Sequence, residues 1–115
     1  MEGFWTVQFV GIQGWDAGVV TLVNGQVLGG DSGFTYIGTY TQEGNMMTAK
    51  IHVKRYVPGV RNVMGQSEFD LELTGTLDGG VLNFTATIPM TKMKLNGTLT
   101  KRLALATKAS SQAAR

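Results

Sequence analysis

Residues 17–30 read AGVVTLVNGQVLGG, and this stretch decides the fold class. Asn24-Gly25 lies between two runs rich in apolar and β-branched residues. An Asn-Gly pair in that position is the strongest short-range signal for a β-hairpin, because both residues tolerate a positive φ. The stretch therefore predicts a strand over residues 17–23, a two-residue turn, and a short strand over residues 26–29 that ends at Gly29-Gly30-Asp31.

The alternation of apolar and polar residues continues on both sides of this hairpin. It recurs around Trp5 to Phe9 and in runs near residues 34–40, 47–54, 68–74, 82–88 and 93–99. A period of two is typical of strands with one buried face. We therefore predict an all-β fold, an eight-stranded up-and-down antiparallel barrel over residues 1–103, since closure removes exposed sheet edges. Residues 104–115 lack this period and are expected to form a disordered or frayed tail.

The composition excludes several classes of protein. Glycine supplies 16 of 115 residues, which disfavours a helical bundle, and Gly38, Gly75 and Gly97 fall within strands where a closing sheet must bend. The absence of cysteine excludes disulfides and thiolate zinc sites, and one histidine cannot build a typical zinc site. No cofactor or metal is expected. The chain also lacks a long apolar run and a basic, apolar leader, so we expect no membrane insertion and a cytoplasmic location.

Two predicted strands carry charges of opposite sign on their polar faces, basic on the first strand and acidic on the second. If the strands that flank the 57–65 connection pair as a hairpin, three basic side chains face three acidic ones on the polar side of the sheet. This predicts a solvated structural ladder of paired charges. Because the acidic residues neutralise the basic ones, the ladder has no positive potential that would attract the phosphates of a nucleic acid. The histidine is then a partner of an aspartate, and because no activated serine accompanies it, the chain is not expected to be an enzyme. The opposed pairs are Lys50 with Glu72, His52 with Asp70, and Lys54 with Glu68.

Two groups of apolar residues are candidates for binding. Apolar side chains in a loop or turn usually mark a partner surface, a dimer contact or a lid, and they occur here at Val57, Val60, Val63 and Met64 and at Trp15 in the first turn. The interior of an eight-stranded barrel is filled by side chains or holds one small ligand. The residues expected to line that interior are Trp5, Val7, Phe9, Phe34, Tyr36, Met47, Ile51, Leu71 and Met93.

Several segments together resemble the GrlR-like family of negative regulators of type III secretion. The matching residues are Gly3-Phe4-Trp5, the segment Asn24–Asp31 (NGQVLGGD), Tyr36-Ile37-Gly38, and Ala49–Tyr56 (AKIHVKRY). The resemblance runs from about residue 3 to about residue 100, and the Asn-Gly hairpin followed by Gly-Gly-Asp is its most specific part.

The resemblance implies a lipocalin-like barrel that forms a homodimer and inhibits a transcriptional activator by binding it, without contacting DNA. It also implies a hydrophobic cavity able to take a lipid. The family's secretion regulator has an acidic run, Glu-Asp-Glu-Asp, in the turn that here reads Gln42-Glu43-Gly44-Asn45. We therefore expect a regulatory binding protein that sequesters another protein. A carrier or sensor of a small apolar ligand is the alternative, and a domain that serves only in assembly is a third.

Overall fold

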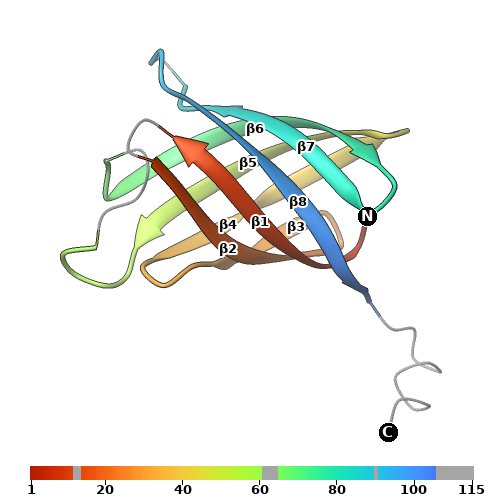
Figure 1. Cartoon of the computed structure of the whole chain (residues 1–115), viewed down its shortest axis with the longest axis horizontal. Coiled ribbons are helices and arrows are strands. Elements are labelled where there is room, and N and C mark those ends of the chain that lie inside the picture. The colour runs from red at the N-terminus through yellow and green to blue at the C-terminus, as the bar shows by residue number, and fades with distance from the viewer. Residues whose placement is uncertain (12–13, 61–64, 90, 106–115) are drawn as a thin grey trace, which may run out of the picture.

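The computed structural model describes the chain except for residues 12–13, 61–64, 90 and 106–115. Every regular element in the described part is a strand (Figure 1). The strands are β1 (Gly3–Gly11), β2 (Gly14–Val23), β3 (Gln26–Gly30), β4 (Phe34–Glu43), β5 (Met46–Arg55), β6 (Glu68–Asp78), β7 (Val81–Thr87) and β8 (Lys94–Ala104).

Each strand pairs antiparallel with the next, and β8 pairs with β1, which closes the sheet into a barrel. The predicted eight-stranded up-and-down barrel is therefore confirmed. Closure matters physically because no strand is left with a row of unpaired backbone groups at an edge. The decisive hairpin also forms as expected, with Asn24 at φ 50° and Gly25 at φ 75°, the positive values that a tight two-residue turn requires.

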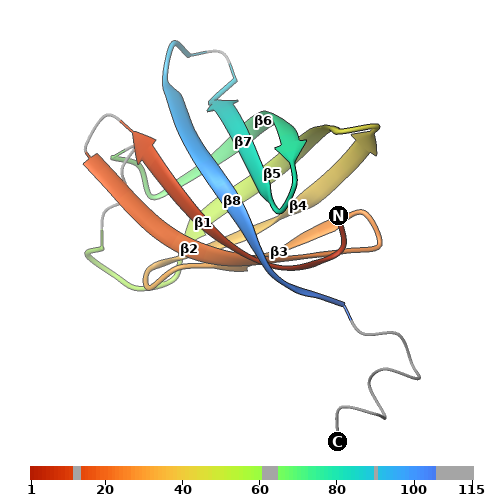
Figure 2. The same ribbon diagram turned by 45° about the vertical axis from the view of Figure 1, so that its right-hand side comes forward.

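The barrel has two dissimilar ends. At one, which we call the hairpin end, the turns after β2, β4 and β6 are two residues long, and the N-terminus lies beside the end of β8 (Figures 1 and 2). At the other, the loop end, the connections include the long segment between β5 and β6. β8 runs through Ala104, which pairs with Gly3, so the first residue of the expected tail belongs to the sheet. Residues 106–115 lie outside the described part.

The interior is a single apolar core. The strands alternate buried and exposed residues, most regularly along β6 and β7, as their sequence period predicts. In β1 two large residues, Phe4 and Trp5, are adjacent and therefore point to opposite faces of the sheet. The structure buries Trp5 to 1% exposure and leaves Phe4 outside at 37%. The Trp5 indole N–H donates to the Met1 carbonyl at 3.0 Å, so the buried ring keeps its polar group satisfied.

Glycine allows neighbouring backbone segments to approach at two positions in the sheet. A methyl group added at Gly38 would lie 2.0 Å from the Lys50 carbonyl oxygen. One added at Gly97 would lie 2.5 Å from the Phe84 ring, which packs directly beneath this residue. The strand glycines singled out in the sequence are thus places where a side chain would collide with the curved sheet or its core.

Candidate functional site

The barrel encloses an apolar cavity of about 70 Å³. Apart from Tyr36, its lining side chains are purely hydrocarbon or thioether. The Tyr36 hydroxyl donates to the Asp31 carboxylate, and burial, reinforced by that carboxylate, raises the pKa of Tyr36. Known small-molecule sites usually enclose roughly 300–1,000 Å³. In this conformation the interior is therefore nearly filled by side chains.

Six of the nine residues expected in the interior line this cavity: Val7, Phe9, Tyr36, Met47, Ile51 and Leu71. The other three do not. Trp5 and Phe34 are buried toward opposite ends of the barrel and belong to the core that closes them. Met93 is half-buried just before β8, and its sulfur accepts a hydrogen bond from the Gln66 amide at 3.2 Å. Alternation along a strand predicts which side chains point inward, but it does not predict where along the barrel axis the cavity lies.

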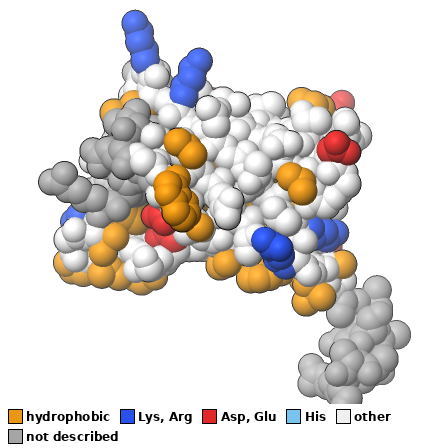
Figure 3. Space-filling model, viewed as in Figure 1, with side chains coloured by type: hydrophobic (Ala, Val, Ile, Leu, Met, Phe, Trp, Pro, Cys, Tyr) orange, Lys and Arg blue, Asp and Glu red, His pale blue; other side chains and the backbone are white. Residues whose placement is uncertain are grey.

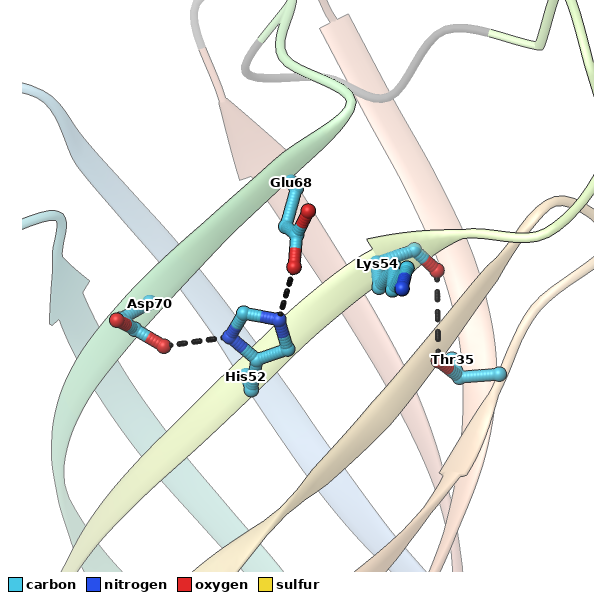
Figure 4. A network of polar contacts seen from close by, with 5 residues as sticks. All are labelled: Thr35, His52, Lys54, Glu68 and Asp70. Atoms are coloured by element: carbon cyan, nitrogen blue, oxygen red, sulfur yellow. Dashed lines mark hydrogen bonds and ion pairs between the residues drawn. The ribbon is translucent and has the colours of Figure 1, made fainter.

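The charged ladder forms on the outer face of β5 and β6 with the expected register. Lys50 lies opposite Glu72, His52 opposite Asp70, and Lys54 opposite Glu68. The side-chain contacts differ from the register in one respect, because Glu68 turns diagonally to His52 instead of pairing with Lys54 (Figure 4). Diagonal neighbours on adjacent strands lie within reach of long side chains.

His52 is held between two carboxylates. Its Nδ1 lies 2.7 Å from the Asp70 Oδ1, and its Nε2 lies 2.7 Å from the Glu68 Oε2. A neutral imidazole donates only one hydrogen bond, whereas an imidazolium donates two, so both contacts favour the charged form. The hydrogen bond to Asp70, followed by the one to Glu68, raises the pKa of His52. Neither ring nitrogen is free to act as a base.

The connection between β5 and β6 is less exposed than its sequence suggests. Val57 and Val60 are half-buried, and Val60 packs against the core and beside Gly33, where an added methyl group would lie 2.5 Å from it. Val60 is therefore not a freely exposed apolar side chain, because it packs against the core at the loop end of the barrel, and its expected role in a partner surface, dimer contact or lid stays a prediction. The other two candidates, Val63 and Met64, lie outside the described residues.

The outer surface of β1 to β4 is the feature that the sequence analysis missed. The outward positions of these four strands carry no charged residue except Glu43 at the end of β4. Cross-strand partners from five adjacent strands form one row here, and Val19 lies diagonally beside it. The row comprises Leu103, Phe4, Thr21, Leu28 and Ile37.

We call this row together with Val19 the apolar face. Its five hydrophobic side chains are between 37% and 69% exposed. Hydrophobic side chains line the lower border of the molecule in Figure 3, where β2 and β3 run. Contiguous exposed apolar residues of this kind usually mark a contact surface. A usable signal was present in the sequence, since the polar positions of strands 1–4 hold threonine and apolar residues where a solvated strand usually has charges.

The remaining candidates lie apart from the apolar row. The turn at the position of the family's acidic run is exposed and holds one acid, Glu43, while the Gln42 side chain donates to the Gly44 carbonyl at 2.9 Å. Trp15 lies at the start of β2, is 73% exposed, and pairs with Val10 on β1.

The chain matches no protein-family model, and no curated protein is significantly similar to it. In the part of the chain that the structure describes, no three histidine or acidic residues gather in a way that could hold a metal ion. Among the same residues, no helix is long and apolar enough to cross a membrane.

Proposed function

We propose that this chain is a non-enzymatic regulatory binding protein that works as a homodimer and sequesters another protein. The apolar face is the observation that carries the proposal. It spans five neighbouring strands of the closed barrel and therefore follows the curve of the barrel wall. A standard protein interface buries about 800 Å² per partner, so a second copy would cover part of this face.

The apolar face fits a second copy of the chain. A two-fold dimer brings the same patch of both subunits together, so any net charge there would face its own copy and repel it. Apart from Glu43, the outward positions of β1 to β4 carry no charge, whereas a dimer formed through β5 and β6 would have to remove the six charged side chains of the ladder from water. Burial of Phe4, Leu28 and Ile37, at about 25 cal/mol per Å² of apolar area, would drive the association.

The regulatory part of the proposal rests on the resemblance to the GrlR-like proteins. It leads us to propose a transcriptional regulator as the sequestered partner, with no direct contact to nucleic acid. The mixed charges of the β5–β6 ladder agree with this, because a protein that binds phosphates concentrates basic side chains on one surface. Both ring nitrogens of His52 are hydrogen-bonded to carboxylates, which agrees with a non-enzymatic role.

The test measures assembly first. Native mass spectrometry and light scattering at micromolar concentration should give a dimer, and Ile37→Lys should give a monomer with an unchanged fold, because a desolvated lysine would face its own copy. Thr85→Lys, an exposed change on β7, is the matched control and should stay dimeric. A monomeric wild type, or a dimer indifferent to Ile37→Lys, contradicts the proposed interface.

The sequestered partner requires a separate experiment. Affinity capture from the native host should recover a protein with a DNA-binding domain, and adding the purified chain should release that protein from its DNA in a mobility-shift assay. Capture without loss of DNA binding, or no specific capture, would argue against the regulatory role while leaving the dimer intact.

The second candidate function is a carrier or sensor of a small apolar ligand. The lining of the cavity, which is apolar except for Tyr36, favours it, and the volume of about 70 Å³ opposes it for anything as large as a lipid. A lipid-sized adduct that survives native mass spectrometry would make this the leading function. It would also require the core side chains to move.

A further inference from the structure

A second surface lies on the outer wall of the barrel, closer to the loop end than the apolar face. A shallow groove of about 550 Å³ runs over the outer surface of β7, β8 and β1 toward the loop end. Its polar lining consists of Gln8 on β1, Asn83 on β7, and Asn96 and Thr98 on β8. Its apolar lining comprises Val10 and Trp15, at the end of β1 and the start of β2, together with Phe9 and Phe84. None of these residues carries a charge.

The polar side chains of the groove are available to a ligand. Gln8 is opposite Thr98, and Thr98 is opposite Asn83, so three strands present one side chain each to the same row. None of these side chains hydrogen-bonds to another residue that the structure describes. Each amide offers two donors and an acceptor, and a hydroxyl offers both. The row therefore presents unpaired donors and acceptors at intervals of about 4.8 Å.

The aromatic side of the groove is unusual in its exposure. Trp15 is 73% exposed, the highest value among the large hydrophobic residues that the structure describes, and Val10 beside it is 58% exposed. An indole ring in water presents a flat apolar face that can stack on a ligand surface of C–H groups. A ligand that satisfies both sides must have closely spaced hydroxyls and an apolar face.

From this combination we propose that the groove binds a neutral carbohydrate. A pyranose ring has an apolar C–H face that can stack on Trp15, and its vicinal hydroxyls both donate and accept, as the amides of Gln8, Asn83 and Asn96 do. The spacing of the row is comparable to the length of one sugar unit, so neighbouring side chains can contact successive units. An anionic ligand would find no cation among the lining residues, and an apolar partner would leave the amides unpaired at a cost.

This proposal does not depend on the dimer or on a sequestered partner. The groove residues are absent from the apolar face, so the two surfaces can be tested separately. A sugar bound here would change neither the dimer mass nor its response to Ile37→Lys.

The tryptophans make binding directly observable. The chain has two, of which Trp5 is 1% exposed, so quenching by acrylamide reports Trp15. The purified wild-type protein is titrated with cellohexaose, xylohexaose and maltohexaose and applied to an array of neutral glycans. At least one neutral glycan should protect Trp15 from acrylamide at concentrations up to about 5 mM, the range of weak single-site recognition.

Variants locate the site. Trp15→Ala should weaken binding at least tenfold, and Asn96→Ala about fivefold, the effect of one hydrogen bond of about 1 kcal/mol. Because Trp15→Ala removes the fluorescent reporter, saturation-transfer NMR on the sugar reads binding in every variant. Gln26→Ala, an exposed amide on β3, is the matched control and should bind like the wild type.

Two results would overturn the proposal. One is no binding of any neutral glycan by the wild type up to about 5 mM. The other is binding that Trp15→Ala and Asn96→Ala leave unchanged while both variants keep the wild-type melting temperature.

Discussion

Replacing His52 with glutamine tests how the ladder on β5 and β6 contributes to stability. The wild-type imidazolium donates to Asp70 and Glu68, and glutamine keeps the bulk but loses the charge. Both contacts raise the pKa of His52 in the folded state. Their contribution to the free energy of unfolding is therefore fully present below the unfolded pKa of about 6.5, and it is lost as the pH rises through the folded pKa. His52→Gln should therefore destabilise the protein more at low pH than at high pH.

The magnitude follows from the exposure of the partners. The side chains of His52, Glu68 and Asp70 are 45%, 51% and 72% exposed, so water screens both contacts. Exposed pairs of this kind contribute about 0.2–1 kcal/mol each, which gives a loss of about 1 kcal/mol in His52→Gln near pH 5.5 at low salt. For a domain of this size that corresponds to a fall in melting temperature of about 4 °C. Near pH 8.5 the difference should approach zero.

The assay is urea unfolding of wild type and variant at a series of pH values. His52 is the chain's one histidine, so the difference between the two curves reports the contribution of His52 and its two contacts. NMR of the His52 ring should place its pKa above about 6.5. That pKa should fall further in Asp70→Asn than in Glu68→Gln, because the bond to Asp70 is the larger cause of the shift. A stability difference that is independent of pH, or that grows toward high pH, would refute the reasoning.

Two further predictions concern packing. Leu82→Ala should lower the free energy of unfolding by about 2–5 kcal/mol, because Leu82 is completely buried; a loss below about 1 kcal/mol in urea would mean that the site is loosely packed. Gly38→Ala should cost about 1–3 kcal/mol by pushing a methyl group into the Lys50 carbonyl. Gly80→Ala is the control, because its added methyl group would have its nearest neighbour at 4.0 Å. Its free energy of unfolding should stay within about 0.5 kcal/mol of the wild-type value. Equal losses in the two glycine variants would contradict the steric argument.

The fold could be predicted because its determinants are local. Asn24-Gly25 sets a turn through its own backbone angles, and a period of two marks a buried face without knowledge of the partner strand. The register of β5 on β6 followed in the same way, since one connection joins neighbouring strands and places His52 opposite Asp70. The diagonal contact of Glu68 to His52 could not be predicted so easily, because it depends on side-chain conformations across the sheet.

The binding surfaces could be predicted only in part. Val60 looked exposed because sequence shows that a residue is in a loop but not whether the loop folds back on the barrel. Trp15 was singled out from its position in the first turn, whereas the amides that accompany it come from β1, β7 and β8. These residues are far apart in the chain, so no local pattern connects them.

By itself, the sequence determined the strand segments, the tight turns and the inward side of most strands, because backbone preference and hydrophobic period are properties of a short stretch. Only the tertiary structure decided that Trp5 is buried outside the cavity lining and that the cavity measures about 70 Å³. It also decided that Phe4 and Leu103, from opposite ends of the chain, lie side by side on one apolar face. Barrel closure is the physical reason, because pairing β8 with β1 brings into contact the two strands that are farthest apart in the sequence.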